Sequence, residues 1–337
     1  MGYAPAGWQN LQSVFSQYDS EILATIGLVV ENDQGKRYDR FRDRIMFPIH
    51  DQKGQVIGFG GRVINPEDTP KYYNSPETPL FQKGHELYGL FMARRAMRDA
   101  GRALVVEGYM DVVALAQYGI EYAVAALGTA TTPFHITKLM RQTDEIVFCF
   151  DGDNAGKKAA WRAAMNALPA LNDGLKLSFL FLPEEHDPDS YVRAYGAPAF
   201  EKVIKEAMSI SSFFFKVASE GHELTTPEGR AHTHHAAKPL LLSMPPIALR
   251  TQILRELAIR TNTTPAELEA FCGLTVAPAP VQQPTQARTQ NNFPNSSNRQ
   301  GAPWQASKGS AKRVATQNIE PPKAPTDLAE QMLRVLI

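Results

Sequence analysis

Six acidic residues stand in three short clusters along the chain, and each cluster follows a run of apolar residues. The clusters are Glu107 with Asp111, Asp151 with Asp153, and Asp187 with Asp189. The apolar runs, at residues 103–106, 146–150 and 177–182, show little polar alternation, which is typical of strands buried on both faces of a parallel sheet. Ligand sites in such sheets lie at the carboxyl ends of the strands. We therefore expect three strand ends to bring these carboxylates to one crevice.

Carboxylates that share a crevice repel one another unless a cation neutralises them. Mg²⁺ prefers oxygen ligands and combines carboxylates with the phosphates of a substrate. The pattern therefore favours metal-assisted phosphoryl transfer. Taken singly, the clusters indicate less, because Asp111 is also typical of the first turn of a helix, and Asp187 and Asp189 of a turn. Their occurrence together in one stretch of alternating strands and helices favours the metal site.

The motifs that contain these acids resemble the Toprim signature of primases and topoisomerases. They are Glu107-Gly108-Tyr109-Met110-Asp111, Asp151-Gly152-Asp153-Asn154-Ala155-Gly156 and Asp187-Pro188-Asp189-Ser190. Upstream segments are similar to the bacterial replicative DNA primases in particular, at residues 38–49, 58–62, 71–78, 81–84 and 87–90. The resemblance extends from about residue 2 to about residue 273.

The resemblance implies an activity and a role for each acid. The chain would be a DNA-directed RNA polymerase that makes short RNA primers on single-stranded DNA by two-metal-ion nucleotidyl transfer. Glu107, Asp151 and Asp153 match the principal metal-binding and catalytic acids of the family, and Asp111, Asp187 and Asp189 match its supporting acids. The implied cofactor is Mg²⁺ or Mn²⁺, as two ions. Because the chain has only two cysteines, Cys149 and Cys272, no cysteine-based zinc site is expected.

A basic surface for the template and the nucleotide is also implied. Its candidate residues are Arg42, Arg44, Arg62, Lys71 and Lys83. They fall in residues 36–102, which hold 13 Lys and Arg against 8 Asp and Glu, whereas residues 103–200 hold 7 against 12. A basic segment beside an acidic one suits a protein that follows a nucleic-acid backbone next to a metal site. Tyr72 and Tyr73, beside Lys71, either stack on bases or anchor the loop to the core.

The implied partners are a single-stranded DNA template, ribonucleoside triphosphates, a replicative helicase and a single-stranded DNA-binding protein, at a replication fork in the cytoplasm. Two departures from the family matter here. The zinc-binding domain and the first part of the polymerase core are not found before the matching residues. Of the helicase-interacting domain, only about one helix is found, at residues 323–337. We therefore expect a fragment of a longer primase.

The composition is ordinary for a soluble globular protein, and no membrane partner is expected. The chain has 337 residues, a hydrophobic content of 43% and no net charge. No apolar stretch approaches the roughly 20 residues that a membrane span needs, and the N-terminus lacks the basic and apolar regions of a signal peptide. The scarcity of cysteines suits a reducing cytoplasm.

The expected fold class is α/β. Residues 1–100 are expected to be an α+β segment, the remaining part of the N-terminal core, which faces nucleic acid. Residues 101–196 are expected to form a Toprim-like unit with a parallel sheet and right-handed crossovers, and residues 197–274 a helical bundle. Residues 275–322 are rich in Pro, Gln, Asn and Ser and should be a disordered linker. Residues 323–337 would begin the helicase-interacting domain.

Local patterns predict individual elements of the flanking segments. Residues 1–35 favour helices, and residues 45–64 favour a β-hairpin. Residues 65–84 favour an irregular loop, and a helix should follow from residue 85 to residue 100. The histidines between residues 232 and 235 match no metal-binding motif and are expected to be solvated loop residues.

Two alternative functions remain open. A haloacid-dehalogenase-like phosphatase also has an Asp-x-Asp motif after an apolar strand, with Asp151 as the nucleophile, but it would not need Glu107. A non-catalytic Toprim module would bind only DNA or partner proteins. Metal titration would distinguish this module, because an intact set of acids should bind Mg²⁺ or Mn²⁺.

Overall fold

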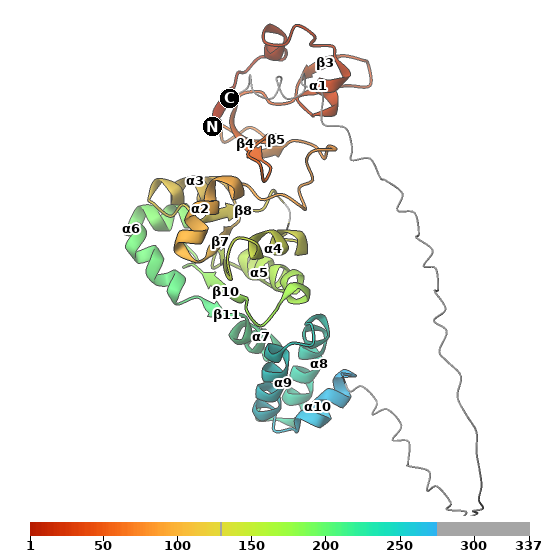
Figure 1. Cartoon of the computed structure of the whole chain (residues 1–337), viewed down its shortest axis with the longest axis vertical. Helices are drawn as coiled ribbons and strands as arrows, with labels where there is room; N and C mark the ends of the chain where they lie inside the picture. Colours follow the sequence, from red (N-terminus) through yellow and green to blue (C-terminus); the bar gives the residue numbers. More distant parts are fainter. Residues whose placement is uncertain (129, 275–337) are drawn as a thin grey trace, which may run out of the picture. The chain divides into compact units, whose positions relative to one another are not determined.

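The structure, a computed structural model, describes residues 1–128 and 130–274 (Figure 1). The linker expected at residues 275–322 and the partial domain expected at residues 323–337 lie outside the described residues. Within the described ranges the chain is mixed α/β, as predicted, with antiparallel strands first, then a mainly parallel sheet with helices, and then a helical part. No helix in these ranges is long and apolar enough to cross a membrane.

The N-terminal segment contains a four-stranded antiparallel sheet. Its strands, in spatial order, are β1 (Gly2–Ala4), β4 (Arg44–His50), β5 (Val56–Val63) and β6 (Tyr72–Asn74). The hairpin predicted at residues 45–64 is confirmed as β4 and β5. Its turn is held by Asp51, whose carboxylate accepts the backbone N–H groups of Lys53 and Gln55. Gly54 completes the turn with a φ of +86°, which L side chains rarely adopt.

The prediction that residues 1–35 are helical is wrong. The segment holds β1, a 3₁₀ helix (η1, Asn10–Ser13), a short helix (α1, Glu21–Thr25) and the strand β2 (Val29–Glu31), which pairs with β3 (Arg37–Asp39). Gly27, with a φ of +74°, follows α1 and turns the chain toward β2. Leu28 and Val29 then pack into a small separate core with residues from distant segments, namely Phe15, Tyr18, Phe41 and Phe59. Tertiary packing therefore overrides the local helical pattern.

Two element boundaries also differ from the prediction. The loop expected at residues 65–84 contains β6, and the helix expected from residue 85 begins only at Leu90 (α2, Leu90–Ala100). Tyr88 instead forms an isolated β-bridge with Ala125. Gly89 then caps α2 in the left-handed conformation, with a φ of +82°.

The central unit is a five-stranded sheet with the order β11-β10-β9-β7-β8. The parallel strands are β7 (Ala103–Val106), β8 (Ala123–Ala125), β9 (Glu145–Phe150) and β10 (Lys176–Phe181), and the edge strand β11 (Met208–Ser209) runs antiparallel. The parallel sheet predicted from continuous apolar runs is confirmed. Every residue of β7 and β8 is buried, as expected of strands that are covered on both faces.

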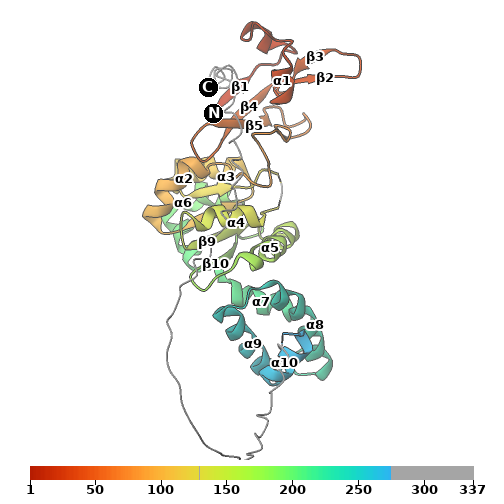
Figure 2. The ribbon, with the colours of Figure 1, turned by 45° about the vertical axis from the view of Figure 1, so that its right-hand side comes forward.

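A helix follows each parallel strand. These helices are α3 (Tyr109–Gln117), α4 (Pro133–Met140), α5 (Asn154–Ala167) and α6 (Pro188–Lys205), and a 3₁₀ turn (η2, Leu168–Ala170) follows α5. Figures 1 and 2 show α2, α3 and α6 on one side of the sheet and α4 and α5 on the other. The N-termini of α3, α5 and α6 therefore lie at the carboxyl edge of the sheet, where the three acid clusters also fall.

One hydrophobic core joins the four-stranded antiparallel sheet to the five-stranded sheet. The buried cluster of the parallel sheet continues into Phe47 and Ile49 of β4, and into Phe81, Leu87 and Tyr88 of the segment before α2. Protein cores are close-packed and resist displacement of their members. The antiparallel strands are therefore held against the unit that carries the acids.

The C-terminal part of the described chain is helical, as predicted. Its helices are α7 (Ile210–Ala218), α8 (Pro227–Ser243), α9 (Ala248–Arg260) and α10 (Pro265–Cys272). Ser209, Thr226 and Thr264 cap α7, α8 and α10, and each side chain accepts a backbone N–H of the first turn.

The histidines predicted to lie in a loop belong to α8 instead. The helix begins upstream of them because Thr226 supplies the cap and Pro227 occupies the first turn. Nε2 of His234 lies 2.7 Å from the buried hydroxyl of Thr261, so this ring has a structural contact.

Candidate active site

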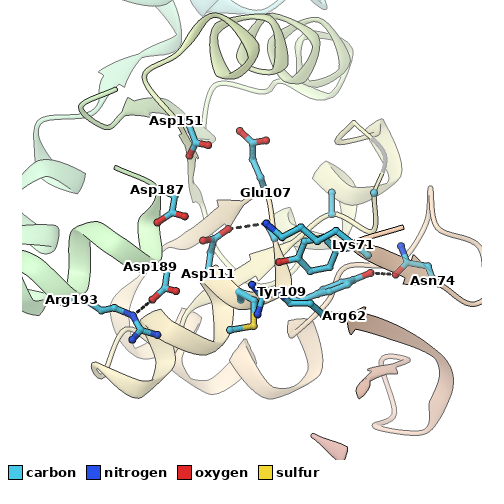
Figure 3. A pocket seen from close by; sticks show the side chains of 15 residues that line it. Arg62, Lys71, Asn74, Glu107, Tyr109, Asp111, Asp151, Asp187, Asp189 and Arg193 are labelled. Carbon is cyan, nitrogen blue, oxygen red and sulfur yellow. Dashed lines mark hydrogen bonds and ion pairs between the residues drawn. The ribbon is translucent and has the colours of Figure 1, made fainter. Parts of the chain in front are cut away.

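A pocket of about 510 Å³ opens at the carboxyl edge of the parallel sheet (Figure 3). We call it the acidic pocket. Five of the six predicted acids line it, namely Glu107, Asp111, Asp151, Asp187 and Asp189. Its cations are Arg62 and Lys71, from β5 and the residue before β6, and Arg193 from α6. Carboxylates from three strand ends thus share one crevice with positive side chains from α6 and from the N-terminal segment.

The first acid cluster lies at the turn from β7 to α3. Glu107 directly follows the strand, and Asp111 lies in the first turn of the helix. The Asp111 carboxylate accepts a hydrogen bond of 3.0 Å from the backbone N–H of Gly108. Burial, and then the charge of Asp187, raises the pKa of Asp111 to about 7 despite that hydrogen bond. Asp111 therefore both caps the start of α3 and belongs to the pocket.

The second cluster requires glycine beside its acids. A side chain at Gly152 would overlap the carbonyl oxygen of Leu182, and one at Gly156 would overlap the carbonyl oxygen of Asp151. Asp151 follows β9 and lines the acidic pocket. Asp153 is exposed and caps α5, where its Oδ1 accepts the backbone N–H of Gly156 at 2.7 Å. Asp153 is thus the one predicted acid that does not line the pocket.

The third cluster lies at the start of α6. Asp187 is the N-cap, and its Oδ1 accepts the backbone N–H of Ser190 at 2.7 Å. Asp189 pairs with Arg193, one turn further along the helix. Both acids have the ordinary roles of a helix start that the sequence also allows, and both line the acidic pocket.

The acids oppose one another's ionisation. The pKa of Glu107 is raised by burial and then by the charges of Asp151 and Asp153. The pKa of Asp151 is raised by burial and then by the charges of Asp187 and Asp153, so Asp153 acts on the pocket from its margin. Among the described residues, no three His, Cys, Asp or Glu side chains are already arranged as metal ligands. The fit of a metal rests on the donor set, since converging carboxylates suit a hard cation such as Mg²⁺ or Mn²⁺.

The five predicted cations are divided between two pockets and a loop. Arg62 and Lys71 line the acidic pocket. Arg42 and Arg44 line a second pocket of about 440 Å³, and Lys83 lines neither of the two.

The loop that carries Lys83 is anchored at the start of α4. The carbonyl oxygen of Lys83 lies 3.1 Å from Nε2 of His135, and the Thr132 hydroxyl donates to the carbonyl oxygen of Gly84 at 2.6 Å. Nδ1 of His135 accepts the backbone N–H of Thr132 at 3.1 Å, which leaves Nε2 as the donor to Lys83. The ring is fully buried, and this burial lowers the pKa of His135 to about 4.

Sequence reasoning missed several side chains of the second pocket, which we call the arginine pocket. Its arginines and tyrosines are Tyr38, Arg40, Arg42, Arg44 and Tyr73. The guanidinium of Arg42 lies 4.2 Å from the ring centroid of Trp8 and 5.1 Å from that of Tyr38. The guanidinium groups of Arg40 and Arg44 lie 5.5 Å and 5.6 Å from the ring centroid of Tyr73.

A signal for this pocket was present in the sequence. Tyr38, Arg40, Arg42 and Arg44 occupy alternate positions, which an extended chain places on one side. The two adjacent tyrosines differ in role. Tyr73 is half-buried against the second core and accepts a hydrogen bond of 2.7 Å from Arg40, whereas Tyr72 is 39% exposed and lines the acidic pocket.

Three family models match the chain. The model of the N-terminal domain of the DNA primase catalytic core matches residues 1–94, and a Toprim-like model matches residues 104–192. The model of the DnaB-helicase binding domain of primase matches residues 211–266. This last match falls mainly on α7, α8 and α9, upstream of residues 323–337, where the sequence alone predicts the start of helicase contacts.

Similar proteins include the DNA primase of Neisseria meningitidis serogroup A. It is 54% identical over 274 residues, which cover 81% of this chain and 46% of that protein. The chain thus spans about half the length of the curated relatives it matches.

Solved structures are also similar. One is a crystal structure of a DNA primase domain from Pseudomonas aeruginosa, with a TM-score of 0.77 at 49% identity. The alignment covers 81% of this chain and 86% of the Pseudomonas chain. Another is a structure of the DnaG primase catalytic domain bound to single-stranded DNA, with a TM-score of 0.74 at 48% identity. This alignment covers 79% of this chain and 84% of the chain in that structure.

Proposed function

The chain belongs to the bacterial DNA primase family, in which it corresponds to the catalytic core, and we propose that it synthesises short RNA primers on single-stranded DNA. The observation that carries the proposal is the meeting of acids from three strand ends with cations from another sheet in the acidic pocket. Such acids suit metal ions, and such cations suit a triphosphate. The reaction would join a primer 3′-hydroxyl to the α-phosphate of a ribonucleoside triphosphate and release pyrophosphate.

Mg²⁺ or Mn²⁺, as two ions, would lower the pKa of the attacking hydroxyl and neutralise the leaving pyrophosphate. We assign Glu107, Asp151 and Asp153 as the principal ligands and catalytic acids, with Asp111, Asp187 and Asp189 in support. The cap role of Asp153 is compatible with this assignment, because the cap uses only Oδ1 and leaves the other carboxylate oxygen for a ligand.

We assign the cations to two tasks according to the pocket that each lines. Arg62 and Lys71 would hold the nucleotide phosphates, because they share the acidic pocket with the metal-binding acids. Arg42 and Arg44 would hold the template in the arginine pocket, where guanidinium groups meet phosphates and the rings stack on bases. Lys83 would extend this basic surface from its anchored loop. The similar catalytic domain solved with single-stranded DNA supports the choice of template.

A helicase partner follows from the match to the helicase-binding model. We propose that the helices within residues 211–266 contact a replicative helicase. With residues 1–100 facing nucleic acid and residues 101–196 forming the metal site, the chain would act at a replication fork in the bacterial cytoplasm, where a single-stranded DNA-binding protein is also present.

Incorporation of labelled ribonucleotides on single-stranded DNA tests the proposal. Asp151→Ala should abolish incorporation without loss of the fold, because removing one of several repelling carboxylates relieves strain in the metal-free site. Asp99→Ala, on the exposed side of α2, is the matched control and should retain activity. Incorporation by Asp151→Ala at the level of the unsubstituted protein would refute the mechanism.

The same proteins and assay distinguish the polymerase from the two alternative functions. A phosphatase that uses Asp151 as its nucleophile would form a covalent aspartyl phosphate, which mass spectrometry of the acid-quenched protein would detect. A non-catalytic Toprim module would bind metal and DNA but would incorporate no ribonucleotide. Membership of the primase family favours the polymerase over both.

A further inference from the structure

The side-chain amide of Asn74 joins strand β6 to the start of α3 and to the loop after β8, and both of these segments border the acidic pocket. The hydroxyl of Tyr109 donates a hydrogen bond to Oδ1 of Asn74 (Figure 3). Nδ2 of Asn74 donates to the carbonyl oxygen of Leu127 at 3.0 Å. Tyr109 begins α3, and Leu127 lies in the loop after β8. The oxygen and the nitrogen of the Asn74 amide therefore both form hydrogen bonds with the Toprim-like unit.

The ring of Tyr109 has little room to move. It is 4% exposed, and its centroid lies 5.5 Å from that of Phe47 and 4.9 Å from that of Tyr88. Gly60 of β5 also approaches so closely that a Cβ there would lie 2.6 Å from the ring. Packing on these sides therefore directs the hydroxyl toward Asn74.

The linkage lies between the two charged walls of the pocket. Lys71 directly precedes β6, and β6 pairs with β5, which carries Arg62. Glu107 and Asp111 lie on either side of Tyr109 in the sequence. A shift of β6 relative to α3 would therefore change the distance between these cations and these acids.

We propose that Asn74 is a positioning residue for nucleotidyl transfer, which sets the distance between the nucleotide-binding cations and the metal-binding acids. This inference rests on the proposed function. A bound triphosphate would reach from Arg62 and Lys71 to the acids, so its α-phosphate would be displaced whenever the two walls move apart. A displacement of about 1 Å can lower an enzymatic rate by about 10²-fold.

The kinetic test uses two variants that break the linkage and two matched controls. Asn74→Leu removes both hydrogen bonds, and Tyr109→Phe removes one hydroxyl while the ring stays packed. The controls are Asn65→Leu and Tyr118→Phe, which are exposed and lie outside the pocket.

We expect Asn74→Leu to lower kcat for ribonucleotide addition about tenfold or more, with the nucleotide KM changed by less than about threefold, because the phosphate contacts remain while their placement is lost. Adding Tyr109→Phe to Asn74→Leu should have little further effect, because the hydrogen bond is already absent. The controls should keep the kcat of the unsubstituted protein.

A second readout does not depend on activity. Nitroxide labels at Ile64→Cys, just after β5, and at Gln117→Cys, at the end of α3, report the distance between the two walls by pulsed electron paramagnetic resonance. Both positions are exposed, whereas the native Cys149 and Cys272 are buried. We expect a broader distance distribution in Asn74→Leu than in the unsubstituted protein or in Asn65→Leu.

The outcomes separate the inference from the function on which it rests. An unchanged distance distribution in Asn74→Leu would overturn the inference, whether or not kcat falls. If no form of the protein adds ribonucleotides while the distribution still broadens, the proposed function fails and the structural linkage stands. Should Asn74→Leu not fold, Tyr109→Phe carries the same comparison with Tyr118→Phe as its control.

Discussion

The guanidinium of Arg193 is paired with the carboxylate of Asp189 at the edge of the acidic pocket (Figure 3). The pair spans one turn of α6, so the cation comes from the same unit as the acids, unlike Arg62 and Lys71. In the metal-free protein, Arg193 therefore neutralises part of the negative charge that a divalent cation would otherwise meet.

Removing this charge should strengthen metal binding. Two unit charges about 4 Å apart interact by about 1 kcal/mol in water, so we expect Arg193→Gln to bind Mn²⁺ about threefold to fivefold more tightly at low salt. Titration calorimetry with Mn²⁺ measures this change. Arg95→Gln, which breaks an exposed pair with Asp99 on α2, is the control and should leave the affinity unchanged. Weaker binding by Arg193→Gln would show that the arginine does not compete with the metal.

Asp111 should destabilise the metal-free protein as the pH rises. Its pKa is about 7 in the folded chain, against an ordinary value of 3.8. Between these values the folded protein holds a proton that the unfolded chain has released, so the free energy of unfolding falls as the pH rises. Asp111→Asn removes this effect. We expect it to raise the free energy of unfolding at pH 8 by ~2 kcal/mol, less than the full shift implies because the site is partly solvated.

Denaturant unfolding with a chelator, at pH 8 and pH 4, tests this prediction for Asp111. At pH 4 the two proteins should be almost equally stable, because the folded carboxyl group is protonated in the unsubstituted chain as well. A variant that is less stable than the unsubstituted protein at pH 8 would contradict the prediction.

Buried strands of the fold were predictable to within one residue where their apolar runs are continuous. The runs at residues 103–106, 146–150 and 177–182 correspond to β7 (Ala103–Val106), β9 (Glu145–Phe150) and β10 (Lys176–Phe181). The N-terminal segment was not predictable in this way, since its separate core brings Phe15, Phe41 and Phe59 together from three distant segments. A local sequence pattern does not predict contacts between segments that are so far apart in the chain.

For the candidate site, residue type and spacing predicted the acids but not their surroundings. Five of these acids reach one pocket because parallel strands end at the same edge of the sheet. The division of the basic residues between two pockets depends on strand pairing, which the sequence does not show. The contact between Asn74 of β6 and Tyr109 of α3 joins elements that are far apart in the sequence, so residue spacing does not predict it.

His135 should make the protein less stable on acidification. Its buried ring has a pKa of about 4, against an ordinary value of 6.5. Between these values the unfolded chain binds a proton that the folded chain does not. The free energy of unfolding should therefore fall by about 3 kcal/mol from this group alone as the pH drops from about 7.5 to about 4. His135→Gln should flatten this part of the stability profile, whereas the exposed His235→Gln should not. Denaturant unfolding across this pH range provides the measurement. If the free energy of unfolding of His135→Gln fell with pH as steeply as that of the unsubstituted protein, the low pKa would not belong to His135.

Arg42 and Trp8, which stack on each other beside the arginine pocket, should contribute to DNA binding in different ways. If Arg42 contacts a template phosphate as proposed, Arg42→Ala should make the slope of log affinity against log salt shallower by about 0.7. Trp8 is 61% exposed and offers a surface for stacking. Trp8→Ala should cost about 1–3 kcal/mol of binding free energy without changing the salt slope, because stacking releases no counterions.

Fluorescence anisotropy of a labelled single-stranded oligonucleotide at several salt concentrations measures the affinity and the slope together. Lys53→Ala, at the exposed hairpin turn, is the control for loss of a positive charge that lies outside both pockets. Lys71→Ala and Lys83→Ala should each weaken binding with a shallower slope if these residues also meet phosphates. The comparison locates the path of the strand. A slope that changes in Lys83→Ala but not in Arg42→Ala would place the template over the loop anchored by His135, and would remove the arginine pocket from the binding surface.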